Sequence, residues 1–164
     1  MIVFIAGATG AIGRPLVQQL SPPDMGDRHN SIGGEARTPP FRRCYRRRRR
    51  RPRQRLRRAI ITASPHVVID QLTDLAQPLR PGGFGDWLKG TVALRRDVTP
   101  ALVDAARAAG ASRVIAQSAA FMTAPEGPDI DDENAALYLD APQPLTASIT
   151  SNAELEAVVA RSGT

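Results

Sequence analysis

The first twenty residues combine a strand pattern, a glycine-rich turn and a helix pattern. The β-branched run Ile2–Ala6 predicts a short buried strand. Residues 7–13 read GATGAIG, and in residues 14–20 the apolar positions recur at helical spacing. This part of the chain therefore predicts a strand, a tight turn and a helix in direct succession.

A second patterned stretch begins at Ala59. The apolar run His66–Asp70 predicts a buried strand, and residues 84–109 predict one helix or two, divided near Pro100. Gly110 is the expected stop signal, and Arg113–Gln117 predicts a third strand.

The end of the chain carries a capping box. Ser151 and Glu154 have the spacing of such a box, so we expect a final helix over residues 155–160 that closes at Gly163. Strands that are apolar throughout and alternate with helices are typical of a parallel sheet covered on both faces. The fold class predicted for this single domain of 164 residues is therefore doubly wound α/β.

Residues 21–58 interrupt this pattern. They show neither helical nor strand periodicity and are rich in Pro, Gly, Asp, Asn and Arg, so we expect a disordered segment. Twelve of the 22 basic residues fall between Arg42 and Arg58, where no acidic residue occurs. The other 147 residues carry 10 basic and 16 acidic groups, so the overall charge of +6 comes from this block alone.

The arginine block leaves a nucleic-acid hypothesis open. Twelve arginines could neutralise many phosphates, but residues 42–58 contain one tyrosine and no helical period that would build a base-stacking surface. We therefore expect non-specific contacts with nucleic acid or anionic surfaces from this segment, rather than an evolved nucleic-acid site.

Several site classes are disfavoured by composition. The single cysteine, Cys44, cannot form an internal disulfide, which favours a reducing, cytoplasmic setting. No apolar run approaches the length of a membrane span, and the apolar start lacks the basic flank of a signal peptide. Because no Cys/His cluster has metal-ligand spacing, and Asp131–Glu133 reads as a solvated loop, we predict no metal site.

The candidate chemistry is concentrated in the turn at residues 7–13. A dinucleotide pyrophosphate must approach backbone N–H groups at a helix N-terminus, which favours residues without a β-carbon. Gly7, Gly10 and Gly13 meet that requirement at three-residue spacing, between an apolar strand and a helix. The pattern predicts a dinucleotide-binding turn.

The chain resembles a known enzyme family. The turn GATGAIG, the strand VVID, the helix VTPALVDAARAAGASR and the following VIAQSAAF are similar to extended and atypical short-chain dehydrogenase/reductases of the NAD-dependent epimerase/dehydratase group. The resemblance covers residues 1–20 and 59–164. It implies a Rossmann-like sheet that binds NAD or NADP and an oxidoreductase or isomerase acting on a carbonyl or sugar-nucleotide-like substrate.

The resemblance also implies site residues. The cofactor glycines would be Gly7, Gly10 and Gly13, with turn amides from Thr9, Ala11 and Ile12. The end of the second recognisable strand would line the nicotinamide-side ribose through Asp70, Gln71, Leu72 and Thr73. Ser118 would be the catalytic residue that orients the substrate carbonyl.

The sequence departs from the family at the proton donor. The family uses a Tyr and a Lys four residues later, and Leu145 and Ile149 stand at those places. Lys89 is the only lysine, and Tyr138 has no Lys four residues after it. The chain also ends one helix after Ser118, so the family's substrate-binding region is expected to be absent. Substrate and oligomeric state are left open.

The second and third strands of the family's sheet should fall within residues 21–58, which also hold the position that distinguishes NAD from NADP. A shifted reading frame would explain their absence, because a run of CGN arginine codons becomes GNC codons for Val, Ala, Asp or Gly one base forward. The genomic nucleotide sequence tests this hypothesis. If it holds, the strand at residues 2–6 is left at an edge of the sheet.

Three functions therefore stay open at the level of sequence. The first is the NAD(P)-binding domain of an epimerase/dehydratase-type oxidoreductase. The second is an inactive, truncated and frame-disrupted relic of such an enzyme, and the third is an arginine-rich binder of nucleic acid or anionic surfaces.

Overall fold

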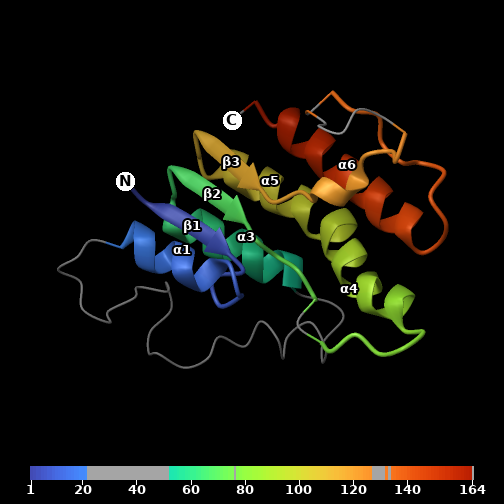
Figure 1. The fold of residues 1–164 in the computed structure, drawn as a ribbon. Helices are drawn as coiled ribbons and strands as arrows, with labels where there is room; N and C mark the ends of the chain where they lie inside the picture. The colour runs from blue at the N-terminus through green and yellow to red at the C-terminus, as the bar shows by residue number, and fades with distance from the viewer. Residues whose placement is uncertain (22–51, 76, 127–131, 133, 164) are drawn as a thin grey trace.

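A computed structural model describes residues 1–21, 52–75, 77–126, 132 and 134–163. Its centre is a parallel sheet of three short strands in the order β1-β2-β3, formed by Val3–Ala6, Val67–Asp70 and Arg113–Ala116 (Figure 1). Each strand lies within one residue of its predicted bounds. The mixed α/β arrangement fits the predicted Rossmann-like fold, although the sheet is incomplete.

The register divides the strand residues between two faces of the sheet. Phe4, Val68 and Val114 are aligned across the three strands, and the next row along the chain aligns Ile5, Ile69 and Ile115. Because successive side chains point to opposite faces, these two rows face opposite sides.

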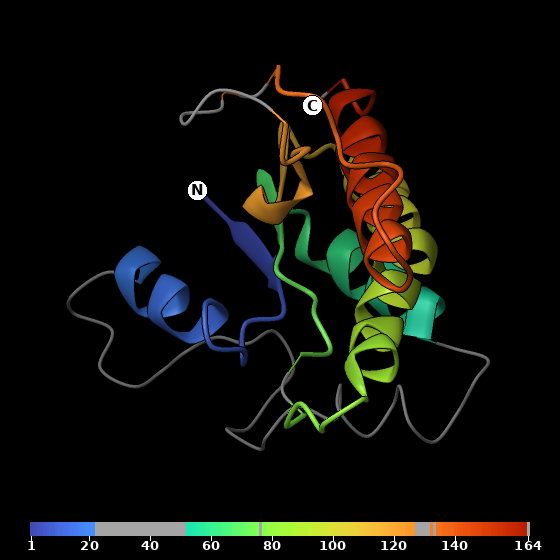
Figure 2. The ribbon, with the colours of Figure 1, turned by 45° about the vertical axis from the view of Figure 1, so that its right-hand side comes forward.

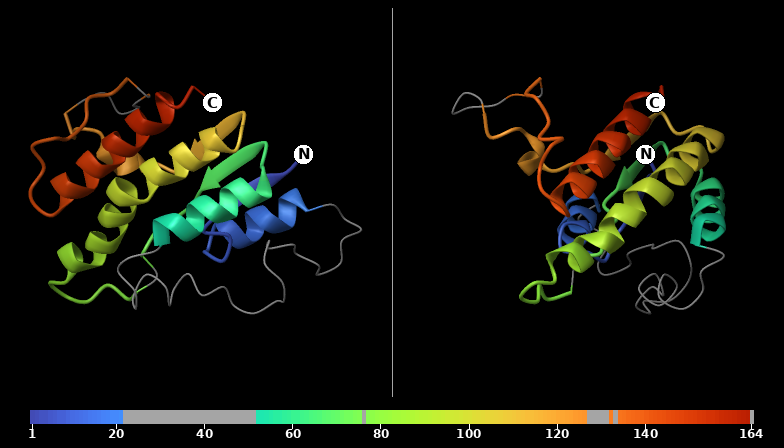
Figure 3. Two further views of the ribbon diagram at one scale, coloured as in Figure 1. Left: turned by 180° about the vertical axis from the view of Figure 1, so that it is seen from behind. Right: turned by 90° about the vertical axis from the view of Figure 1, so that its right-hand side faces the viewer.

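In the described part of the chain, five α-helices and one 3-10 turn accompany the sheet. Figure 2 shows α1 on one side of the sheet, while α3, α4, α5 and α6 lie on the other. Their bounds are α1 Gly13–Leu20, α3 Pro52–Ala63, α4 Phe84–Asp97, α5 Thr99–Ala108, η1 Ala120–Met122 and α6 Leu145–Ala160. Seen from behind, α3 and α5 run side by side over the sheet, in agreement with their extensive mutual contact (Figure 3).

The main core lies between the sheet and the pair α3 and α5. Leu56 and Ile60 of α3, Val68 of β2 and Leu102 of α5 are each at most 1% exposed and belong to one cluster. Burying such a side chain stabilises the fold by roughly 1.5–3 kcal/mol. The helices α3 and α5 are therefore held by a shared core rather than by local propensity alone.

The predicted helix division near Pro100 and the predicted helix ends at Gly110 and Gly163 are confirmed. Residues 84–109 form two helices that meet at Val98, and Pro100 occupies the first turn of the second, where its missing N–H costs nothing. Gly110 and Gly163 adopt positive φ of 75° and 67° just after α5 and α6.

Two predictions about element bounds are wrong. Residues 52–58, expected to lack structure, begin helix α3, because the spacing of Leu56 and Ile60 buries one face of it in spite of the surrounding arginines. The final helix starts at Leu145 rather than at a capping box. Ser151 lies inside α6, fully buried, and its Oγ donates to the carbonyl of Ser148 at 2.8 Å. The rest of the predicted disordered segment, residues 22–51, lies outside the described residues.

Strand β1 pairs only with β2 among the described residues, so it lies at an edge of this sheet. No helix in the described part of the chain has the length and apolarity that a membrane crossing requires.

Candidate functional site

The carboxyl ends of the three strands meet at one edge of the sheet. The register of Ala6, Asp70 and Ala116 continues beyond the strands, because Gln71 N donates to the Ala6 carbonyl at 2.9 Å and Gln117 N donates to that of Asp70 at 3.2 Å. Ligands of open parallel sheets bind outside this edge. The edge therefore brings together the glycine-rich turn, Gln71 and the chain leading to Ser118.

Two glycines of the turn are required by close packing. Gly7 has φ +91°, and a Cβ added there would lie 2.5 Å from the carbonyl oxygen of Gln71. Gly13 is buried at the start of α1, and a Cβ there would overlap the carbonyl oxygen of Gly7 and the backbone of Ala8. These positions fold the turn back between β1 and β2, so their glycines serve the fold.

Gly10 differs from the other two because it is exposed to solvent and less closely packed. Its N–H donates to the Gly7 carbonyl at 2.9 Å, and its own carbonyl accepts from Arg14 N at 3.1 Å. An added Cβ would meet only the Gly7 carbonyl oxygen, at 3.2 Å, and residues 9–12 are all exposed. Gly10 is thus the position at which a ligand can reach the backbone of the turn.

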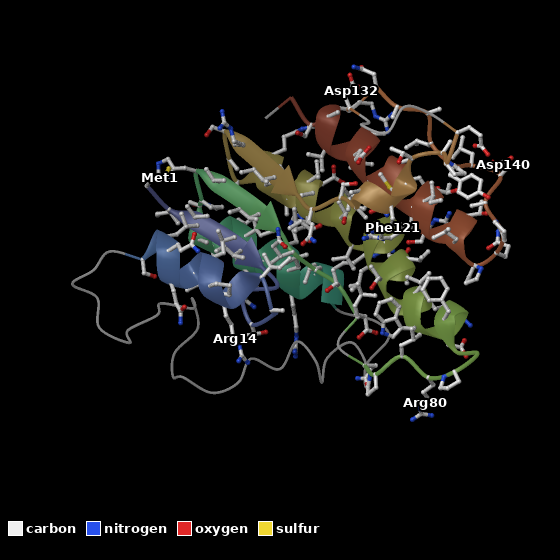
Figure 4. The ribbon with its side chains drawn as sticks, viewed as in Figure 1. Met1, Arg14, Arg80, Phe121, Asp132 and Asp140 are labelled. Carbon is white, nitrogen blue, oxygen red and sulfur yellow. The ribbon has the colours of Figure 1, made fainter. Side chains whose placement is uncertain are left out.

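The start of α1 leaves its first N–H groups without a side-chain acceptor. Ile12 is the N-cap residue and makes no side-chain cap. The N-terminus of a helix favours negative charge. Arg14 N already donates to the Gly10 carbonyl and Pro15 has no N–H, so Gly13 N is the donor of the first turn of α1 that faces no intrahelical acceptor. The Arg14 side chain extends outward from this end of α1 (Figure 4). The residues present fit a pyrophosphate group at the turn.

Asp70, predicted to line a ribose, is turned inward. It is 4% exposed; its Oδ2 accepts from the Thr99 hydroxyl at 2.8 Å and its Oδ1 from Leu72 N at 3.1 Å. Burial raises the pKa of the Asp70 carboxyl, while its hydrogen bonds and the nearby Arg95 guanidinium act in the opposite direction. Burial also lowers the pKa of Arg95. The Asp70 side chain therefore ties β2 to the start of α5.

The next three residues occupy different environments. The Gln71 backbone lies against Gly7, and its Oε1 is buried without a hydrogen-bond partner. Leu72 packs on the main core, and Thr73 is exposed. Gln71 is thus the member of this group that the structure places beside the glycine-rich turn.

Ser118 follows β3 by two residues and has a partner that the sequence did not suggest. Its Oγ donates to Oε1 of Glu156 in α6 at 2.5 Å, and the Met122 sulfur lies 3.9 Å away. Phe121, 56% exposed, lies on η1 beyond the end of β3 (Figure 4). No motif pointed to Glu156, because its proximity to Ser118 depends on how α6 packs against β3.

Leu145 and Ile149, which the sequence resemblance aligns with the Tyr and Lys of the dehydrogenase/reductases, lie in a second apolar cluster. Ile149 is fully buried with Met122 and Ala141, and Leu145 packs against them. Tyr138 packs against the same cluster, and Lys89 is exposed on α4. A hollow of about 430 Å³ lies between α4 and the start of α6. It shares no residue with the glycine-rich turn or with the Ser118–Glu156 pair. Its lining residues are Gly82, Gly85, Asp86, Leu88, Lys89, Val92, Pro144 and Ala147.

Within the described residues, no three His, Cys, Asp or Glu side chains are grouped so that they could hold a metal ion.

No protein-family model matches the chain. A curated Streptomyces protein described as a 3-diazoavenalumate denitrifying reductase is 42% identical to it over 166 residues. The alignment covers 99% of this chain and 52% of that protein, so the chain spans about half the length of this relative. The similarity to a reductase fits an oxidoreductase.

Proposed function

We propose that this chain forms the cofactor-binding half of an NAD(P)H-dependent reductase related to the short-chain dehydrogenase/reductases. The observation that carries the proposal is the packing of the glycine-rich turn. Gly7 and Gly13 are enclosed by backbone atoms, whereas Gly10 is exposed beside a helix N-terminus that has no side-chain cap. This division of roles is what a pyrophosphate site requires. The 42% identical reductase supports the same function.

Within this proposal, the turn backbone at residues 9–13 would hold the pyrophosphate, and Gln71, whose backbone lies against Gly7, would contact the cofactor beside the turn. A nicotinamide cofactor held there would supply a hydride to the substrate. Parallel strands are spaced about 4.8 Å apart, so the chain beyond β3 lies roughly 10 Å from the turn. Ser118 and Glu156 then belong to the substrate end of the site.

For the substrate, we propose an organic diazonium ion, by analogy with the diazo compound and the loss of nitrogen in the relative's name. Hydride arrives with its electron pair and forms a C–H bond, while the C–N bond breaks and its pair leaves with N2. The substrate carbon is reduced, the cofactor is oxidised, and the step consumes no proton.

The two apolar residues at the family's proton-donor positions support this reaction. Reduction of a carbonyl creates an alkoxide that must be protonated, and Leu145 and Ile149 offer no proton. Displacement of N2 makes no alkoxide, so their apolar character does not impede it. The same two residues weigh against the carbonyl or sugar-nucleotide substrate that the family resemblance implies.

The proposal is tested by incubating the whole chain with benzenediazonium ion and NADH or NADPH deuterated at C4. We expect release of N2 and formation of benzene carrying one deuterium, at a rate above that of the protein-free mixture. The Gly10→Val variant should lose this excess rate, because the branched side chain blocks the turn. Reduction of benzaldehyde but not of benzenediazonium would contradict the proposed substrate, and equal rates with and without protein would contradict the proposed function.

A further inference from the structure

We infer that Glu156, acting through Ser118, makes the substrate end of the site selective for a positively charged group. This inference rests on the proposed function and deepens it. The two side chains are joined by the 2.5 Å hydrogen bond in which Ser118 Oγ donates to Glu156 Oε1. Ser118 is half-buried, while Glu156 is exposed on α6.

The direction of this hydrogen bond decides what Ser118 can offer a substrate. A hydroxyl has one proton to donate and two lone pairs with which to accept. The proton of Ser118 is committed to the Glu156 carboxylate, so its lone pairs remain for a third group. A serine that orients a carbonyl or stabilises an oxyanion must donate. In this structure Ser118 is instead set up to accept, which suits a cation.

The negative charge of the Glu156 carboxylate also favours a cation at this end of the site. A carboxylate beside the reacting carbon opposes the negative charge that builds up on a carbonyl oxygen, and attracts a diazonium ion. In the family pattern a lysine supplies positive charge here, whereas Ile149 is a buried apolar residue. The structure therefore replaces a cation near the substrate end by the Glu156 carboxylate.

Glu154, two residues earlier on α6, provides the contrast. Its carboxylate accepts from the Arg96 guanidinium at 2.8 Å, so its charge is matched locally by α4. Among the described residues, Glu156 is hydrogen-bonded to the neutral Ser118 hydroxyl and to no cationic side chain, which leaves the carboxylate charge available to a ligand. Glu156 is thus a positioning and selectivity residue, and Glu154 is its matched control.

The test compares a cationic and a neutral probe that cannot react. Binding of phenyltrimethylammonium and of benzyl alcohol to the whole chain is followed by saturation-transfer NMR with NADP⁺ present. Glu156→Gln should weaken binding of the ammonium probe about three- to tenfold, a modest factor because the carboxylate is exposed, and should leave benzyl alcohol within about twofold. Glu154→Gln should change neither. Glu156→Lys should reverse the preference for the cation.

Circular dichroism melting of each variant shows whether it folds, and the exposure of Glu156 predicts unchanged melting for Glu156→Gln. Equal changes for both probes, or no change with either Glu156 variant, would overturn the inference. The binding assay needs no turnover, so its outcome is separate from that of the N2 assay. Charge selectivity without N2 release would overturn the proposed reaction alone, and N2 release without charge selectivity would overturn this inference alone.

Discussion

The two faces of the sheet are covered very differently. On the face under α3 and α5, Val68 is fully buried, Val114 is 6% exposed, and both join the main core. On the opposite face α1 lies along β1, and the aligned isoleucines become exposed toward the other edge, from 7% at Ile69 to 44% at Ile115. The closed face carries the stability of the fold, and the glycine-rich turn belongs to the open side.

This difference explains how a sheet of three short strands keeps the edge formed by its carboxyl ends in place. Strands β2 and β3 are fixed from behind by the core beneath α3 and α5, so their carboxyl ends stay in register. The turn on the open side is positioned by its glycines against β2 rather than by a deep core. Substitutions on the two sides should therefore have different consequences.

The largest effect is expected in the closed core. Leu102→Ala removes a fully buried side chain and should lower the free energy of unfolding by about 2–5 kcal/mol. Ile115→Ala on the open face should cost less than about 1 kcal/mol, since much of that side chain is already in water. Urea denaturation of both variants measures the contrast. Similar losses for the two variants would show that the two faces contribute alike.

A smaller effect separates the glycines of the turn. Gly13→Ala forces a methyl group into the Gly7 carbonyl, so we expect a loss of about 1–3 kcal/mol of stability. The Gly10→Ala methyl group meets a single backbone oxygen, at 3.2 Å, and an adjustment of a few tenths of an ångström relieves the contact, so this variant should lose less than about 1 kcal/mol. Thermal melts of the two variants test this division, and an equally unstable Gly10→Ala protein would refute it.

The smallest effect concerns Asp70 and depends on pH. Because burial raises the pKa of this carboxyl above its ordinary 3.8, the native state holds the proton more tightly than the unfolded chain. The resulting stability is present below pH 3.8 and is lost as pH rises through the native-state pKa. Asp70→Asn lacks this titration, so its stability relative to wild type should increase between about pH 4 and pH 7.

Urea denaturation at both pH values measures that difference, and the other titrating groups largely cancel because both proteins carry them. A stability difference that is constant with pH, or that shifts toward the wild type as pH rises, would show that the native pKa of Asp70 is not raised.

Local patterns predicted the strands, the glycine-rich turn and the break before Pro100 correctly, because each depends on neighbouring residues. The start of α6 was missed, since burial of Ser148 and Ser151 against other helices overrides their preference for helix ends. The start of α3 was not predicted, because Leu56 is the one apolar residue among the arginines of residues 53–58 and its helical spacing to Ile60 is a weak pattern. Glu156 could not be found by pattern, as its contact with Ser118 spans 38 positions of the chain.

The most direct test of the central claim, a dinucleotide site at the glycine-rich turn, is a titration of the whole chain with NADH and NADPH, followed by cofactor fluorescence. We expect saturable binding of at least one cofactor, and a rise in melting temperature that follows RT ln(1 + [L]/Kd). Gly10→Val should remain folded and lose both signals. Equal binding to wild type and Gly10→Val, or no binding to a folded wild-type chain, would contradict the account.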